Sequence, residues 1–395
     1  MITLLSFHST VLKEESIIAS STNHLKIRLF KNQLEKFTLS YFLSIENIDR
    51  YFITCTKFSM LDLSILEKYD SQKMYKVYDK WPEIARESFE SNQEPVSFDG
   101  IDDIVFAGMG GSGAIGDVFS SILSKSKMHV NVVKGYHLPQ TVDSNTLVII
   151  VSVSGNTAET FSILDSAYKM RSKIIVFSSG GNMLEYCTKN KIIHKIIPQY
   201  HSPRASFTSY LYSMLNILQS TLEIKQHDVF ESIKKLEENN REINSSNLTD
   251  DNPSLNLAKW IHSIPGIYYP FGLQSAAIRF KNSLQENVKI HAFAEDVMEV
   301  CHNGIVSWER KSNIQPILIE GQDDHIKTKE RWIILKEFLQ ENKIEYKEIM
   351  SVDGSIISKI INLIYLLDYS TIYKAVLDKV DPTPVKSIDY IKSRL

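Results

Sequence analysis

Three hydroxyl side chains lie where a predicted strand gives way to a predicted helix. Ser152, Ser154 and Thr157 follow the apolar run 147–151, which is typical of a buried parallel strand, and a helical pattern begins at Ala158. Free backbone N–H groups and the positive end of the helix dipole are available at such a junction, and small hydroxyls add donors without bulk. The stretch therefore suits a dianionic phosphate. An ordinary helix N-cap in a polar loop is the alternative.

A second strand-to-helix junction is rich in glycine. Gly108, Gly110 and Gly113 satisfy the dinucleotide-binding pattern G-x-G-x-x-G, with Gly111 and Ser112 at the turn. A dinucleotide site also needs an acidic residue at the end of the next strand, and the residues there, 134–136, are Lys, Gly and Tyr. No Gly-Lys-Ser/Thr follows, so the loop is not a P-loop. Two such loops on neighbouring strands face a common crevice, which favours a sugar-phosphate site over an NAD site.

The rest of the chain alternates strands and helices, which predicts βαβ units and parallel sheets. We expect an α/β protein with two parallel-sheet lobes, at residues 59–240 and 241–395, joined near the polar stretch 237–256, and an N-terminal extension at residues 1–58. Strand patterns cover residues 104–107, 130–136, 147–151, 173–177, 266–272, 315–320 and 343–350. Helical patterns cover residues 61–92, the stretch from the glycine loop to 123, 158–170, 204 to about 222, 274–286, 327–341 and 356–375, with a short helix after Pro384.

Composition narrows the class of protein. The 395 residues carry a formal net charge of −3, so the chain lacks the basic field that nucleic-acid binding uses. We expect no apolar run long enough to span a membrane and no secretory signal at the N-terminus. Cys55, Cys187 and Cys301 are odd in number and widely separated, which is typical of reduced thiols in a cytoplasmic protein.

The motifs, taken in order, resemble one family. The chain is similar to SIS-domain sugar isomerases, and more closely to the archaeal and bacterial bifunctional phosphoglucose/phosphomannose isomerases. The resemblance spans roughly residues 60–395 and rests on the glycine loop 108–113 with Asp117, the hydroxyl stretch 152–157, Ser-Pro-Arg-Ala at 202–205, Gln-Glu-Asn-Val-Lys at 285–289, Cys-His-Asn at 301–303 and Asp-Pro-Thr-Pro-Val at 381–385.

The resemblance implies a role for each matching residue. The phosphate and neighbouring hydroxyls of the substrate would be held by Gly111, Ser112, Ser152, Ser154 and Thr157. Arg204 would face the reacting carbons, Glu286 would be the base and His302 would open the sugar ring. A lysine of the final helix would complete the site, and we take it to be Lys392 rather than Lys386. The family works as a homodimer with its active site at the subunit interface.

The chemistry of these residue types agrees with those roles. Aldose–ketose isomerisation moves a proton between C1 and C2 through an enediolate, and one carboxylate that reaches both carbons, here Glu286, can take and return it. Histidine is the side chain best suited to proton transfer near neutral pH, so His302 suits ring opening. Arg204 keeps its charge and suits the enediolate oxygens. Each residue alone also fits a structural role: a solvated helix-end Glu, a core His and a surface ion pair. Glu286 and His302 belong to different elements and must meet by folding or across a dimer interface.

We therefore expect an isomerase of carbohydrate metabolism (glycolysis and gluconeogenesis) that interconverts glucose 6-phosphate, and mannose 6-phosphate, with fructose 6-phosphate. It needs no cofactor and no metal, since no His, Cys or Asp cluster has ligand spacing. One departure is Gly304 after Asn303, where the family often has Glu. A non-catalytic SIS-type sugar-phosphate sensor and an NAD-linked oxidoreductase are the alternatives. We expect sugar phosphates and a second copy of the chain as partners, with no nucleic acid and no membrane.

Overall fold

The computed structural model describes residues 61–394. These residues belong to one compact unit, Leu61–Leu395. The extension predicted for residues 1–58 lies outside the described residues, as does Cys55. Of the other two cysteines, Cys187 is buried and Cys301 is half-buried, and both are free thiols.

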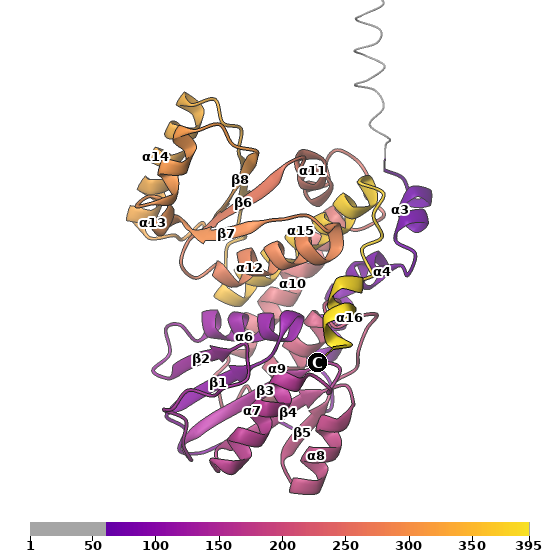
Figure 1. Cartoon of the computed structure of the whole chain (residues 1–395), viewed down its shortest axis with the longest axis vertical. Helices are drawn as coiled ribbons and strands as arrows, with labels where there is room; N and C mark the ends of the chain where they lie inside the picture. Colours follow the sequence, from indigo (N-terminus) through magenta and orange to yellow (C-terminus); the bar gives the residue numbers. More distant parts are fainter. Residues whose placement is uncertain (1–60, 395) are drawn as a thin grey trace, which may run out of the picture. The chain divides into compact units, whose positions relative to one another are not determined.

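The first sheet has five parallel strands in the order β2-β1-β3-β4-β5 (Figure 1). The strands are β1 (Asp103–Ala107), β2 (His129–Val133), β3 (Thr146–Ser152), β4 (Lys173–Ser178) and β5 (Ile193–Ile196). Every residue of β3 is buried, and its side chains alternate between two cores: Leu147, Ile149 and Val151 enter one, and Val148 and Ile150 enter the other. A strand that is apolar on both faces must be covered on both faces.

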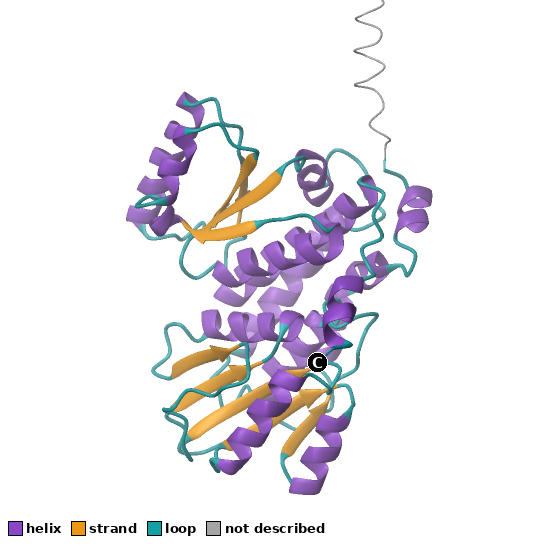
Figure 2. Cartoon of the chain, in the orientation of Figure 1, coloured by secondary structure: helices purple, strands orange, loops and turns teal. Residues whose placement is uncertain are grey.

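Helices cover both faces of this sheet (Figure 2). On one face lie α6 (Gly110–Ile122) and α9 (Phe207–Ile217), and on the other lie α7 (Ala158–Lys169) and α8 (Asn182–Asn190). The result is a three-layer α/β lobe. In each strand–helix unit, the helix begins just beyond the carboxyl end of the strand, which is where both sequence motifs lie.

The second sheet repeats this arrangement with four parallel strands in the order β7-β6-β8-β9. The strands are β6 (Ile264–Tyr269), β7 (Phe293–Asp296), β8 (Ile314–Glu320) and β9 (Lys347–Met350). One face carries α12 (Gln274–Ser283) and α15 (Ile356–Leu377), and the other carries α13 (Val297–Val300) and α14 (Ile326–Glu341). The predicted fold class, α/β with two parallel-sheet lobes, is confirmed.

One hydrophobic core runs through both lobes. The buried residues of α6 and α9 belong to the same cluster as those of α12 and α15. The hydroxyl oxygens of Ser121 in α6 and Ser275 in α12 are 3.3 Å apart. The cluster also receives side chains from α3 (Leu63–Tyr69), α4 (Met74–Asp79), α5 (Trp81–Phe89), α10 (Gln226–Ile243) and α11 (Pro253–Trp260). The lobes therefore pack face to face through their inner helices.

The expectation of no membrane-length apolar segment is wrong for α15. Ile356–Leu377 is long and apolar enough to cross a membrane by length and composition, but 83% of its most apolar window is buried inside the protein. Its apolarity is explained by packing, because it contacts α10, α11 and α12 and fills the core between the sheets.

Several elements differ from the predicted pattern. The polar stretch from residue 237 is helical as far as Ile243, because α10 keeps Leu236 and Ile243 buried on one face while its other face is polar. The edge strands β5 and β7 and the helix α8 were not predicted, since short half-exposed strands carry little apolar pattern. The short helix predicted after Pro384 is confirmed as α16 (Lys386–Lys392).

Candidate active site

The glycine loop forms a tight turn at the N-terminus of α6. A Cβ atom at Gly108 would lie 2.8 Å from the backbone of Ser112, and one at Gly113 would lie 2.7 Å from the carbonyl oxygen of Gly108, so a larger residue fits at neither position. The N-cap residue, Met109, places no side-chain acceptor on the first turn. The helix therefore keeps donors available for an anion at this end.

The loop's charged neighbour is a lysine rather than an acid. Lys134, just after β2, forms an ion pair with Asp117 of α6, with 2.5 Å between Nζ and the carboxylate. Its Cε would lie 3.2 Å from a Cβ at Gly113. A dinucleotide site needs a carboxylate at this place to bind a ribose hydroxyl, so the geometry disfavours the NAD alternative.

The hydroxyl stretch lies beside the glycine loop because β3 is the direct neighbour of β1. The Ser152 hydroxyl accepts from the Gly155 N–H at 3.2 Å and lies 3.3 Å from the Thr157 hydroxyl, while the Ser154 hydroxyl is exposed. Thr157 is the N-cap of α7, yet its side chain makes no capping bond. Thr157 therefore does not act as an ordinary N-cap. The N-termini of α6 and α7, neither capped by a side chain, lie at the same carboxyl edge of the sheet.

Arg204 lies against the glycine loop and is largely buried. A Cβ at Gly111 would lie 3.3 Å from the Arg204 Cα, so glycine allows the two segments to approach closely. The Arg204 Nε donates to the Asn287 side-chain oxygen at 2.8 Å, and Nη2 donates to the carbonyl oxygens of Pro382 at 2.7 Å and Thr383 at 2.8 Å. Only Nη1 is left to face Glu286, whose Oε2 lies 3.6 Å away.

Glu286 belongs to a π-helical turn, η1 (Leu284–Val288), that extends α12. The wider turn adds one residue per hydrogen-bonded ring, and such turns are frequent at functional sites. The Glu286 side chain is 26% exposed, against 8% for Arg204. Within residues 61–394 the Glu286 carboxylate accepts no hydrogen bond, and its contact with Arg204 is its one ion pair. The carboxylate therefore keeps its acceptor capacity for another group.

A buried ion pair beneath the site fixes the backbone of Arg204. Arg279 of α12 and Asp368 of α15 are 3% and 0% exposed and lie 2.6 Å apart. Arg279 also donates to the carbonyl oxygen of Arg204 at 2.9 Å. The Asp368 carboxylate accepts further bonds from the Ser283 hydroxyl at 2.7 Å and the Tyr78 hydroxyl at 3.2 Å.

The C-terminal turn 381–383 closes one side of the site. The Ser71 hydroxyl donates to the Asp381 carboxylate at 2.5 Å, and the Lys289 ammonium donates to the Pro382 carbonyl oxygen at 3.2 Å. Nearby, both ring nitrogens of His201 are buried without a hydrogen-bond partner among the described residues. Burial and the adjacent Arg204 lower the pKa of His201, which keeps that ring neutral near pH 7.

The structure brings together some of the predicted site residues and not others. Gly111, Ser112, Ser152, Ser154 and Thr157 line the edge of the first sheet, and Arg204 joins that edge to Glu286. Lys386 and Lys392 are exposed on α16, which begins just after the C-terminal turn 381–383. His302 is exposed just after α13 and does not contact Glu286 within the chain. In Figure 1, α13 and α16 lie on opposite sides of the second lobe.

The sequence did not indicate Asn287, Lys289 or Arg279 as site residues. Asn287 and Lys289 are within the motif 285–289 that carried Glu286, but no role was assigned to them. A signal existed for Asp368, because it is the lone charge in the otherwise largely apolar stretch 360–373, whereas Arg279 lies close to Lys281 in a mixed segment and gave no such signal. Such charges are rarely buried without a partner.

The departure at Gly304 also has a structural counterpart. A Cβ at Gly304 would lie 3.2 Å from an oxygen of the Glu295 carboxylate. Glu295, to which the sequence assigned no role, thus presents its acid group to the loop that carries His302.

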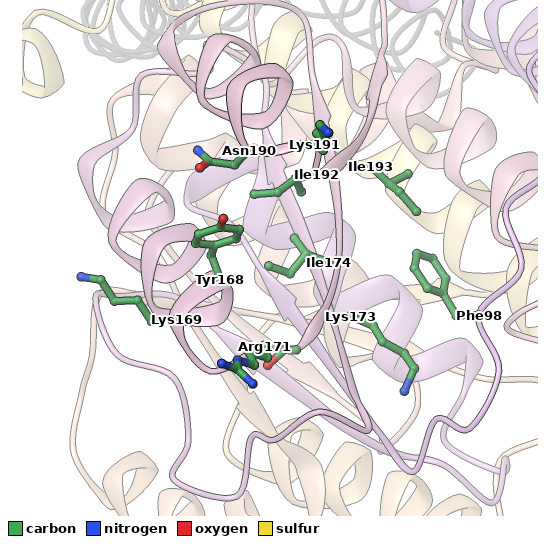
Figure 3. A pocket seen from close by; sticks show the side chains of 11 residues that line it. Phe98, Tyr168, Lys169, Arg171, Lys173, Ile174, Asn190, Lys191, Ile192 and Ile193 are labelled. Atoms are coloured by element: carbon green, nitrogen blue, oxygen red, sulfur yellow. The ribbon is translucent and has the colours of Figure 1, made fainter.

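A separate pocket lies at the opposite edge of the first sheet (Figure 3). It has a volume of about 550 Å³ and surrounds the starts of β4 and β5, with Tyr168, Lys173 and Ile193 among its lining residues. None of the predicted site residues lines it. Among residues 61–394, no group of three His, Cys, Asp or Glu side chains is arranged to hold a metal ion.

Comparisons with known proteins agree with this geometry. The SIS domain model matches residues 100–222, and the model of the bacterial phospho-glucose isomerase C-terminal SIS domain matches residues 250–395. The bifunctional phosphoglucose/phosphomannose isomerase of Caldicellulosiruptor bescii is 33% identical over 312 residues, which cover 76% of this chain and 91% of that protein. The protein of the same name from Thermoplasma acidophilum is 30% identical over 321 residues, covering 78% and 96%.

A solved structure shares the fold. The crystal structure of a hypothetical protein from Thermus thermophilus superposes with a TM-score of 0.65 at 15% identity, covering 88% of this chain and 95% of that one. Two parallel-sheet lobes and the family matches define a phosphosugar isomerase built from SIS domains. Its relatives narrow this class to one family: the chain belongs to the bifunctional phosphoglucose/phosphomannose isomerase family.

Proposed function

We propose that this enzyme interconverts glucose 6-phosphate and mannose 6-phosphate with fructose 6-phosphate by proton transfer through an enediolate. The observation that carries the proposal is the pairing of Glu286 with Arg204. A carboxylate with free acceptor capacity lies 3.6 Å from a buried guanidinium whose other donors are already bound by the protein. A base beside a fixed cation is what this reaction needs, since negative charge develops on the substrate oxygens.

The phosphate is held by the two loops at the edge of the first sheet. Backbone N–H groups of α6 and α7 and the hydroxyls of Ser112, Ser152, Ser154 and Thr157 surround that position. The uncapped helix N-termini support this assignment, because they offer oriented donors without a positive side chain that would need desolvation. The phosphate anchors the sugar so that its C1–C2 end extends toward Arg204, whose backbone contacts the glycine loop.

The proton then moves in two balanced steps. The Glu286 carboxylate takes the proton from C2 of the open-chain aldose, and the electron pair forms the C1–C2 double bond of the enediolate. Arg204 Nη1 stabilises the oxygen charge. Glu286 returns the proton to C1 while the proton of the C2 hydroxyl passes to the C1 oxygen, which gives the ketose with its carbonyl at C2. In the reverse direction, delivery of the proton to one or the other face of C2 gives glucose 6-phosphate or mannose 6-phosphate. Because the base and the cation are both side chains, the proposed reaction uses no metal.

Ring opening is assigned to His302 of a second copy, and Lys392 completes the charge around the sugar. Within one chain His302 is exposed and does not contact Glu286. In a symmetric dimer, His302 of each copy can reach Glu286 of the other, because an isologous interface makes every contact in both directions. The proposed active site is therefore shared between two copies of the chain.

The first test is an isomerase assay with each of the three sugar phosphates, with and without a chelator. We expect turnover of all three to be unaffected by chelator. Glu286→Gln should lower kcat by about 1,000-fold or more while fructose 6-phosphate still binds, because the amide cannot accept the proton. Binding without turnover by the wild-type protein would favour the non-catalytic sensor, and near-normal turnover by Glu286→Gln would show that the base is assigned wrongly.

Mixing two inactive variants tests the shared site. After dissociation and reassociation of Glu286→Gln with His302→Ala, a random mixture contains about half heterodimers, each with one intact site. Activity should return to about a quarter of the wild-type value per chain. If the mixture stays as inactive as its components, His302 does not act across an interface.

A further inference from the structure

Lys289 ends the π-turn that carries Glu286 and points back toward it. Its backbone is left-handed, with φ of 66°, and its N–H donates to the carbonyl oxygen of Leu284. The side-chain ammonium donates to the carbonyl oxygen of Glu286 and to that of Pro382, the second at 3.2 Å. One side chain therefore joins the backbone of the base residue to the C-terminal turn.

The Pro382 carbonyl oxygen accepts from two cations. Arg204 Nη2 approaches it at 2.7 Å, and the Lys289 ammonium approaches it at 3.2 Å. Arg204 faces the Glu286 carboxylate with its remaining Nη1, while Lys289 holds the Glu286 carbonyl. Arg204 thus joins the side chain of Glu286 to the C-terminal turn, and Lys289 joins the backbone of Glu286 to the same turn.

Three charged groups face the ammonium, each from a different segment. Burial, and then repulsion by Arg204, lower the pKa of Lys289 to about 8, and Asp381 and Glu286 act in the opposite direction. The amine therefore remains mostly protonated at pH 7 and loses its proton a short way above neutrality. The residue is exposed to solvent, but its ammonium is bonded to two carbonyl oxygens at the site.

We propose that Lys289 is a positioning residue for the isomerisation: its ammonium ties the carbonyl of Glu286 to the C-terminal turn and so holds the base in register with Arg204. The inference rests on the proposed function of Glu286. The protonated amine has donors enough for both carbonyls, and the neutral amine has fewer and binds carbonyls more weakly. Loss of the bridge leaves only Arg204 to join the Glu286 turn to the C-terminal turn, and the Glu286 backbone loses its own tie to that turn.

The experiment compares Lys289→Met, Lys289→Arg and a matched control, Lys343→Met. Lys343 is exposed at the end of α14 with a similar left-handed φ of 56°, so it controls for replacing a lysine in this conformation. We expect Lys289→Met to lower kcat by about 10- to 100-fold, the range expected when a reacting group is misplaced by about 1 Å. The KM for fructose 6-phosphate should change by less than about 3-fold, because the phosphate loops are untouched.

Two further readouts separate positioning from loss of folding. Lys289→Arg should recover most of kcat, since a guanidinium can also donate to two carbonyls. In the wild type, kcat should fall on the alkaline side as the amine titrates, and Lys289→Arg should keep its kcat to higher pH because arginine stays protonated. Lys343→Met should match the wild type in kcat, KM and pH profile.

The outcomes are distinguishable from a failure of the proposed function. No turnover of any of the three sugar phosphates by the wild-type chain overturns the proposed function and this inference with it. Wild-type turnover together with an unchanged kcat in Lys289→Met overturns this inference alone. The same holds if Lys289→Met loses activity and Lys289→Arg neither restores it nor shifts the alkaline limb, because a structural lesion then explains the loss.

Discussion

Replacing Arg279 with methionine should destabilise the enzyme and impair its active site together. Arg279 and Asp368 are almost fully buried, and the Asp368 carboxylate is bonded at 2.6 Å by Nη2 and at 2.8 Å by Nε of the arginine. Methionine has a similar length and no charge, so the change leaves the buried Asp368 carboxylate without a cation and bonded only by the Ser283 and Tyr78 hydroxyls. The guanidinium also lies over the Phe207 ring, 3.9 Å from its centroid, and methionine keeps part of that packing.

The expected loss follows from the burial of the partner. Breaking a buried pair by removing one member costs about 3–5 kcal/mol, because the other charge is left uncompensated. At about 2 °C per kcal/mol for a protein of this size, the midpoint of thermal unfolding should fall by about 6–10 °C. The matched control is Arg86→Met. Arg86 forms ion pairs with Glu90 and Glu237 but is 41% exposed, so this change should cost no more than about 1 kcal/mol.

A second variant identifies the cause. Arg279→Met combined with Asp368→Asn should recover much of the lost stability, because the amide removes the stranded charge yet keeps an oxygen for Ser283 and Tyr78.

Urea unfolding and the isomerase assay measure the two effects. The Arg279 bond to the Arg204 carbonyl oxygen is absent in both variants, so kcat should stay reduced in the double variant even where stability returns. A loss below about 1 kcal/mol in Arg279→Met, or a double variant no more stable than the single one, would refute the reasoning. Either result would mean that the carboxylate is not stranded when the arginine is removed.

Two further substitutions test the site itself. Arg204→Lys should lower kcat by about 100-fold or more in the isomerase assay, because one ammonium cannot bond the Asn287 oxygen, the Pro382 carbonyl and Glu286 together. A kcat within 3-fold of wild type would contradict the assigned geometry. Gly155→Ala should lower the free energy of unfolding by more than about 1 kcal/mol and raise the KM for fructose 6-phosphate, since Gly155 has φ of 65° and a Cβ there would lie 1.7 Å from the Gly180 carbonyl oxygen. Urea unfolding with no change in midpoint would count against that strain.

The parts of the site that depend on local sequence were predictable. A strand, a glycine or hydroxyl turn and a helix follow one another along the chain, so the two strand-to-helix loops are visible in the pattern alone. Their meeting at one edge also follows from the parallel order of β1 and β3. The parallel sheets were predicted for the same reason, whereas the edge strands β5 and β7 were not, because half-exposed strands lack a continuous apolar run.

The meeting of Arg204 with Glu286 could not be deduced from spacing. The two residues come from different lobes, and their approach depends on how α6, α12 and α15 pack in the shared core. Resemblance to a family suggested the pair, and the structure supplies the physical reason for it: Arg279 holds the Arg204 backbone while Asn287 and the tail hold its side chain. Long-range contacts of this kind leave no periodic signal in the sequence.

The way Arg204 is bonded indicates how its charge acts. Three of its hydrogen bonds go to the protein, to Asn287, Pro382 and Thr383, and its carbonyl is held by Arg279. The guanidinium is therefore already oriented by the protein, and in the proposed reaction little reorganisation would be needed when charge develops on the sugar oxygens. The same bonds make the C-terminal turn part of the cation's support. A change that frees the turn 381–383 should make the position of the Arg204 guanidinium beside Glu286 less fixed, even though the change alters neither Glu286 nor the two loops of the first sheet.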